Sequence, residues 1–184
     1  MTRLATLPEI QAEVWQQLER AAKDRQHAWR TVVLATVDGE AADARTVILR
    51  EVEVHQKQLV IFSDDRAGKV SQMLSHPRGT MVMWSAQLGW QLRCRVQLSL
   101  EMTGLAATSR WAGIKLTPAA QDYLARVAPG TPLDDADGHA PPPLEREYFA
   151  VINAEVRAID WLELHRDGHR RAVFDEQGAR WVQP

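Results

Sequence analysis

The sequence has almost no cysteine, no long apolar run and no excess of basic charge. Cys94 is the only cysteine, so the chain cannot form an internal disulfide, which fits a reducing cytoplasm. No segment approaches the roughly 18 apolar residues of a membrane span, and the residues after Met1 lack the apolar core of a signal peptide. A net charge of -2 and a pI of about 6.3 argue against nucleic acid as a partner. We therefore expect a cytoplasmic protein with neither a membrane nor a nucleic-acid partner.

The motifs of several common chemistries are also missing. The histidines form no metal-ligand cluster with Cys94, so no metal site is predicted. The chain contains neither Gly-x-Ser-x-Gly nor a glycine-rich phosphate loop. A hydrolase is therefore not expected.

The pattern of apolar residues predicts one domain, residues 1–184, built mainly from antiparallel strands. Ile10, Val14 and Leu18 recur at helical spacing and predict an N-terminal helix over about residues 8–23. Strands are expected at 31–37, 43–54, 59–62, 80–85, 90–102, 148–162, 170–174 and 180–182, with further helices at 66–75 and about 118–127 and a proline-rich loop at about 129–143. Six or seven antiparallel strands with peripheral helices, an α+β arrangement, fit a closed or split β-barrel.

Basic and hydroxyl side chains gather around the second and third of these strands. The run Arg45-Thr46-Val47-Ile48-Leu49-Arg50 has a guanidinium group at each end, and Phe62-Ser63 closes the next strand. Arg66 and Lys69 follow directly. Together Arg45, Ser63, Arg66 and Lys69 offer a fork of donors, a hydroxyl and a point charge for one phosphate group. The alternative is that they are solvated charges at strand ends.

Two later segments extend this pattern. Gln91-Leu92-Arg93-Cys94-Arg95-Val96 follows Trp84, and Trp161 precedes His169-Arg170-Arg171. Taken in order with residues 45–69, these segments resemble the pyridoxamine 5'-phosphate oxidase family, and most closely its shorter oxidase-related branch. The resemblance covers about residues 28–181. It implies an FMN-binding split barrel that forms a homodimer, with FMN at the subunit interface and a small-molecule substrate.

The resemblance also implies a role for individual residues. Lys69 matches the family's phosphate-binding lysine, and Gln91 matches its ring-contacting glutamine. Trp161 and Arg171 match a tryptophan and an arginine that reach the flavin from the second subunit, although Trp161 is equally compatible with an ordinary core position. His169 matches a substrate-side histidine and is the candidate proton donor. The full set of implied FMN contacts is Arg45, Thr46, Val47, Ile48, Leu49, Arg50, Phe62, Ser63, Arg66, Lys69, Gln91, Trp161 and Arg171.

The sequence departs from the family pattern mainly where substrate would bind. Ala67-Gly68-Lys69 stands where family oxidases carry Ser-Arg-Lys, so Arg66 is the available replacement for the missing guanidinium group. Asp167 stands where they carry a substrate arginine, and residues 106–115 lack their tyrosine, arginine and serine at spacings of four. We therefore expect an FMN-dependent oxidoreductase that acts on an unidentified small molecule. A flavin store or sensor without turnover is the alternative, and a genuine pyridoxamine 5'-phosphate oxidase is the third hypothesis.

Overall fold

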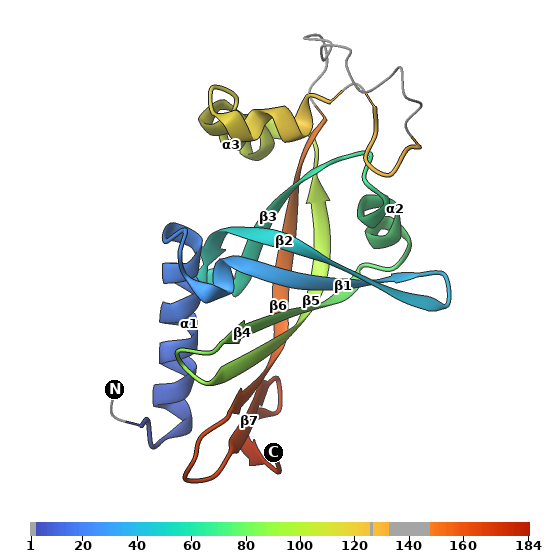
Figure 1. The fold of residues 1–184 in the computed structure, drawn as a ribbon. Helices are drawn as coiled ribbons and strands as arrows, with labels where there is room; N and C mark the ends of the chain where they lie inside the picture. The colour runs from blue at the N-terminus through green and yellow to red at the C-terminus, as the bar shows by residue number, and fades with distance from the viewer. Residues whose placement is uncertain (1–2, 126, 133–147) are drawn as a thin grey trace.

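Long antiparallel strands form the body of the protein, as alternating apolar residues predict. The computed structural model describes residues 3–125, 127–132 and 148–184. Its strands are β1 (Thr31–Asp38), β2 (Ala41–Glu53), β3 (Gln58–Asp64), β4 (Arg78–Ser85), β5 (Trp90–Glu101), β6 (Phe149–Glu163), β7 (Arg170–Asp175) and β8 (Gly178–Val182). The helices are α1 (Leu7–Lys23), α2 (Gly68–Ser75) and α3 (Gly104–Ile114), with short 3₁₀-helices η1 (Ala28–Arg30), η2 (Val54–Gln56) and η3 (Pro118–Tyr123) (Figure 1). From residue 133 onward, the predicted loop at 129–143 lies outside the described residues.

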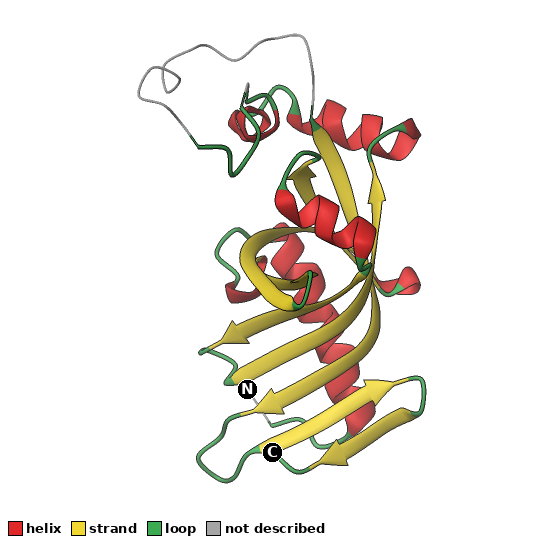
Figure 2. Cartoon of the chain, turned by 90° about the vertical axis from the view of Figure 1, so that its right-hand side faces the viewer, coloured by secondary structure: helices red, strands yellow, loops and turns green. Residues whose placement is uncertain are grey.

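The strands close into a barrel, which confirms the predicted fold class. The sheet order is β3-β2-β1-β4-β5-β6-β7-β8, and β3 also pairs with β6. Six strands therefore close on themselves, while β7 and β8 extend the edge of β6 as a hairpin (Figure 2). The closed barrel has six strands, in agreement with the predicted six or seven, and β7 and β8 bring the described sheet to eight.

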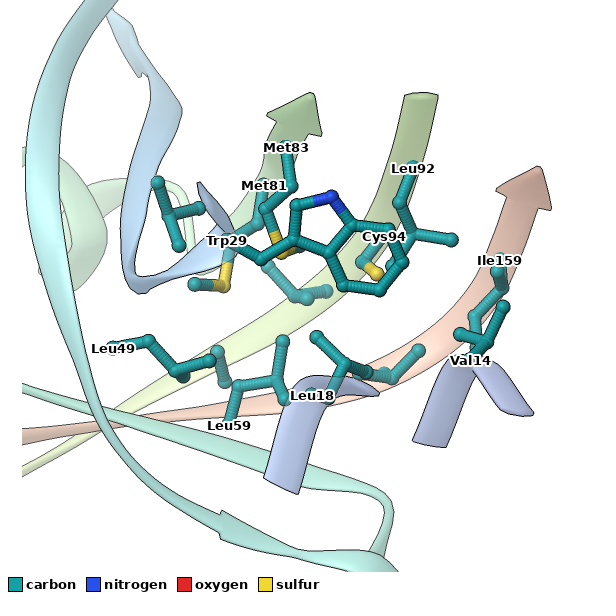
Figure 3. Close-up of a cluster of buried hydrophobic side chains, with 14 of the residues drawn as sticks. Val14, Leu18, Trp29, Leu49, Leu59, Met81, Met83, Leu92, Cys94 and Ile159 are labelled. Carbon is teal, nitrogen blue, oxygen red and sulfur yellow. The ribbon is translucent and has the colours of Figure 1, made fainter. Parts of the chain in front are cut away.

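Helix α1 closes one side of the barrel. Its start is fixed by a capping box, in which the Thr6 hydroxyl accepts from Glu9 N and the Glu9 carboxylate accepts from Thr6 N at 2.9 Å. Ile10, Val14 and Leu18 are fully buried, so the predicted apolar face of the helix is the one that enters the core. Figure 3 shows Val14 and Leu18 at the edge of the buried cluster.

The barrel core is filled by side chains from both ends of the chain. Trp29, Met81, Leu92 and Cys94 are buried there, as the alternation in β5 predicted (Figure 3). Burial raises the pKa of the Cys94 thiol to about 12. Cys94 is therefore a small core residue and is not a reactive thiolate at neutral pH.

A second apolar cluster lies on the outer side of β3 and β6. Val60, Phe149 and Val151 pack there against Trp111 of α3 and Tyr123 of η3. The sequence analysis did not predict α3, and the helix expected at about 118–127 is the short η3 in the described residues. The predicted N-cap is not formed, since the Thr117 hydroxyl donates to Ile114 O at 2.7 Å and does not cap the following turn.

Candidate functional site

Arg45 lies at the barrel end that α2 covers. Its guanidinium group donates to the Thr36 hydroxyl, to Gln72 Oε1 at 2.9 Å and to the Asp43 carboxylate. Arg45 pairs with Leu34 across β1 and β2, so it shares the inner face of the sheet with that core residue. Thr36, Asp43 and Gln72 were not among the predicted residues, because only the strand register and the position of α2 bring them to Arg45.

Lys69 is the second residue of α2 and is partly buried beside Arg45. Burial, and secondarily the charge of Arg45, lowers the pKa of Lys69, while Asp64 raises it less strongly. Among the described residues, no hydrogen bond or ion pair holds the Lys69 ammonium group. The amino end of α2 adds a favourable field for an anion at this point. The structure therefore places a desolvated cation where the sequence predicts a phosphate group.

Ser63 and Arg66 flank Lys69 but already have protein partners. The Ser63 hydroxyl donates to Asp64 O at 3.0 Å. The Arg66 guanidinium group donates to both carboxylate oxygens of Asp64 and to Ala125 O, and it lies 3.3 Å from the Tyr148 ring. Both residues lie on the segment that leads into α2, so the structure brings four predicted residues to one end of the barrel. We call these residues, Arg45, Ser63, Arg66 and Lys69, the Lys69 group.

The remaining predicted residues of β2 divide between the two faces of the strand. Val47 and Leu49 are buried in the core, whereas Thr46 and Ile48 face outward. A β-bulge between Leu49 and Glu51 leaves Arg50 without a strand partner. Along the strand, the side chains of Thr46 and Ile48 are therefore available to a ligand on the outer face, while Arg45 remains available at the barrel end beside Lys69.

The Arg50 side chain contacts the Phe62 ring and lies close to Tyr123 of η3. The Arg50 guanidinium carbon lies 5.7 Å from the centre of the Phe62 ring. Arg50 Nε is buried without a hydrogen-bond partner in the described structure. Burial raises the pKa of Tyr123, and the nearby Arg50 lowers it less strongly. This group lies apart from the Lys69 group, but Tyr148 links the two, because its N–H donates to Tyr123 O at 3.0 Å and its ring lies 3.3 Å from the Arg66 guanidinium carbon.

Gln91 and Arg171 share the outer face of the sheet. Gln91 pairs with Trp84 on β4 and with Leu162 on β6, and Leu162 pairs with Arg171 on β7. Directly opposed residues point to the same side, so these side chains form one row across four strands. Trp84 is 45 % exposed and adds an aromatic surface to the row. Only the pairing register reveals this row, because its members are far apart in the sequence.

The structure places Trp161 in the barrel core, which is the alternative that the sequence left open, and its contact with a flavin stays a prediction. Trp161 is 0 % exposed and packs edge-on against Trp90, with ring centres 5.2 Å apart. Trp161 pairs with Ala172, whereas Arg171 pairs with Leu162, the residue that follows Trp161. The two predicted contacts therefore point to opposite faces, and Leu162 occupies the outward position beside Arg171.

His169 lies on the exposed connection between β6 and β7. Its Nδ1 accepts from His165 N at 3.1 Å, which leaves Nε2 as its outward nitrogen. Asp167 is exposed in the same connection, and its backbone N–H donates to His165 Nδ1. Arg170 is not available to replace the missing substrate arginine, because it donates to both oxygens of Glu163.

Neither of the two grooves described among the placed residues unites the predicted contacts. A groove of about 1060 Å³ lies elsewhere, lined by β4, β5, the bulged middle of β6 and the turn between β7 and β8. It includes Thr36 but none of the predicted contacts. Within the described ranges, no group of three or more histidine, cysteine or acidic side chains is placed to hold a metal ion. None of the helices in the described part of the chain has the length and apolarity needed to cross a bilayer.

Comparison with solved structures gives the same architecture. A pyridoxamine 5'-phosphate oxidase-related, FMN-binding protein from Nostoc punctiforme aligns with a TM-score of 0.73 at 20% identity, over 100% of both chains. PhzG from Burkholderia lata, solved with tetrahydrophenazine-1-carboxylic acid, aligns with a TM-score of 0.73 at 15% identity, over 98% of this chain and 94% of that one. General stress protein 26 from Bacillus anthracis gives 0.53 at 12% identity, over 81% and 93%.

Comparison with the curated proteins gives no match. Residues 12–101 match the family model described as pyridoxamine 5'-phosphate oxidase, FMN-binding domain. This segment holds α1 from residue 12 onward, β1 to β5 and α2, and thus every residue of the Lys69 group. Residues 12–101 are therefore similar to the pyridoxamine 5'-phosphate oxidase FMN-binding domain, and the whole chain has the split-barrel fold of oxidase-related FMN-binding proteins.

Proposed function

We propose that this chain is an FMN-binding oxidoreductase that acts on a small molecule, as a homodimer in the cytoplasm. The observation that carries the proposal is Lys69. Its ammonium group is desolvated, lies beside the like charge of Arg45 and has no described partner, and a phosphate group relieves all three conditions. FMN is the phosphate-bearing ligand that fits a family FMN-binding domain over residues 12–101.

The residues of the Lys69 group suit the phosphate end of FMN. Lys69 binds the phosphate as a point charge, Arg45 offers donors beside it, and the amino end of α2 adds backbone N–H groups. Gln91 and Arg171 suit the polar edge of the ring system, because both present side-chain donors on one exposed face. FMN, when bound, supplies the redox chemistry, while the protein positions it and tunes its electronics.

Two copies of the chain complete the proposed site. Arg45 faces the barrel interior near α2, whereas Gln91 and Arg171 lie on the outer face several strands away. The outer face also exposes apolar side chains, with Val33 at 40 % and Trp84 at 45 %. A second copy that covers this face buries its apolar surface and brings the outer row of one protomer to the Lys69 group of the other.

Flavin titration tests the cofactor. The purified protein is titrated with FMN and with riboflavin, and binding is followed by quenching of flavin fluorescence. Charge-assisted bonds to the phosphate contribute about 1.5–3 kcal/mol each, so FMN is expected to bind at least tens of times more tightly than riboflavin. Equal dissociation constants for the two flavins would remove the basis of the proposal.

Subunit complementation tests the shared site. Lys69→Met and Arg171→Met each damage both sites of a homodimer, but a mixed dimer of the two variants regains one intact site if the site is shared. Mixing the two variants by co-expression is therefore expected to restore tight FMN binding. If both groups act within one chain, no mixture restores it. Sedimentation of the FMN-loaded protein as a monomer at micromolar concentration would also count against the dimer.

A flavin store or sensor is the second candidate, and the β6–β7 connection favours it. His169 is exposed to solvent, and Asp167 is a carboxylate where an anionic substrate requires a cation. Oxidation of pyridoxine or pyridoxamine 5'-phosphate is therefore expected to be very slow. Bleaching of the bound flavin by candidate reductants, followed by recovery in air, distinguishes an enzyme from a store. Turnover of these vitamers at around 1 per second or faster would instead identify a genuine oxidase.

A further inference from the structure

Asp160 holds two guanidinium groups together on the outer face of the barrel. Arg171 Nε and Nη2 donate to the two oxygens of Asp160 at 2.9 and 2.7 Å. Arg93 Nη2 donates to the same carboxylate from the neighbouring strand β5. Asp160 pairs with Arg93 and lies diagonally beside Arg171 in the register of β6 and β7. Three strands thus contribute to one ionic cluster.

The cluster fixes the direction of Arg171. A guanidinium group is planar and presents its donors in a rigid fork. Two of these donors are engaged on one side by Asp160, so the edge that carries Nη1 points away from the carboxylate. Arg171 lies in the outer row with Gln91 and Leu162. Its unengaged edge is therefore available to a ligand on that row.

Asp160 is ionised whenever this arrangement exists. Burial by itself would raise the pKa of Asp160, but the hydrogen bonds and charges of Arg171 and Arg93 outweigh burial and lower it. The Asp160 side chain is only 20% exposed, whereas Arg93 and Arg171 are 43% and 31% exposed. Without the carboxylate, the two cations repel each other and both are free to extend into water.

We propose that Asp160 is a positioning residue for flavin binding. Its carboxylate directs the free edge of Arg171 at the polar rim of the flavin ring, while Arg93 binds the same carboxylate from β5. This inference rests on the proposed function, since it concerns how the same site holds FMN. Asp160 and Arg93 act by holding Arg171 in place and do not contact the flavin themselves. The ring, and not the phosphate, is the part of FMN that Asp160 affects.

A double-mutant cycle on flavin affinity tests the inference. Asp160→Asn is expected to raise the dissociation constants of FMN and riboflavin by the same factor, about tenfold, since both flavins share the ring. In an Arg171→Met background, Asp160→Asn is expected to change neither constant by more than about twofold. Asp160→Glu, which keeps the carboxylate, is expected to recover part of the loss.

Matched controls separate this role from general stability. Asp175→Asn removes a comparable carboxylate that binds Arg180 through two bonds, at 2.8 and 2.7 Å, on the adjacent hairpin. It is expected to leave both flavin constants unchanged. An equal effect of Asp160→Asn with and without Arg171 would overturn the inference, as would an effect on FMN alone. If the unmutated protein binds no flavin, the proposed function itself fails, which is a separate outcome.

Discussion

Replacing Lys69 with methionine is expected to stabilise the apo-protein and at the same time to weaken FMN binding. Lys69 is partly buried, and burial and Arg45 both disfavour its charge. Methionine keeps an unbranched apolar chain without the ammonium group, so the unfavourable charge is removed and the packing is largely kept. The thermal unfolding temperature of the apo-variant is therefore expected to lie above that of the parent protein.

The loss of affinity follows from the contact that the ammonium group would make with the phosphate. One charge-assisted bond contributes about 1.5–3 kcal/mol, so the FMN dissociation constant is expected to rise roughly ten- to a hundredfold. Riboflavin has no phosphate group, and its dissociation constant is expected to stay within about twofold. Flavin fluorescence titrations of the parent and the variant, each with both ligands, measure the four constants. Lys115→Met, at an exposed lysine, is the control and is expected to change none of them.

The pH dependence of apo-protein stability gives an independent check. The pKa of Lys69 in the folded state is below its ordinary value of 10.5, so the unfolded chain binds more protons between the two values. The free energy of unfolding of the parent protein is therefore expected to rise through this window, relative to Lys69→Met, as the pH increases. Below the window the variant is the more stable protein.

Two results would refute this reasoning. If Lys69→Met weakens FMN and riboflavin by the same factor, the ammonium group does not meet the phosphate. If apo-Lys69→Met unfolds at a lower temperature than the parent, the ammonium group is stabilised by the protein itself, and the unbalanced charge that carries the proposed function does not exist.

Three further predictions concern the frame that holds the site. Glu163→Gln is expected to lower the free energy of unfolding by about 1–3 kcal/mol in urea titrations, because a 5 % exposed residue loses its ion pairs to Arg3 and Arg170. Glu155→Gln, at a half-exposed ion pair, is expected to change it by less than about 1 kcal/mol. The pKa of Glu163 is lowered by these arginines against the effect of burial, so the difference between parent and Glu163→Gln is expected to be full above pH 4.5 and to vanish as the pH falls through that lowered pKa. Gly79→Ala is expected to destabilise by about 1–3 kcal/mol, since its new Cβ would lie 2.8 Å from Ala35 O, whereas Gly113→Ala in α3 meets no atom within 4 Å and is expected to be neutral or stabilising.

Periodicity alone was sufficient to predict most of the fold. The apolar repeat at Ile10, Val14 and Leu18 placed α1 within a residue of its observed start, because this face of the helix packs against the open side of the barrel. Strand alternation placed β5 equally well. Helix α3 was missed because its buried face consists only of Ala107 and Trp111, which is too short a pattern to separate a helix from a loop.

The local part of the candidate site was predictable, and the distant part was not. Ser63, Arg66 and Lys69 lie within one short segment, so their proximity follows from the sequence alone. The partners of Arg45 do not, since Gln72 comes from α2 and Thr36 from β1. The cluster of Arg93, Asp160 and Arg171 was likewise invisible, because it depends on the pairing of three strands.

Side chains alternate between the two faces along a strand, but the spacing between two residues of a hairpin does not determine whether they share a face. Trp161 and Arg171 lie on opposite faces because the connection between β6 and β7 pairs Arg171 with Leu162. Arg171 lies on the outer face with Gln91, and the residue between them on that face is Leu162, an aliphatic side chain, and not the indole of Trp161. The nearest outward aromatic ring in that row is Trp84, on β4. A flavin bound on this face therefore meets an aromatic surface from β4 and a charged edge from β7, with Asp160 setting the direction of the charge.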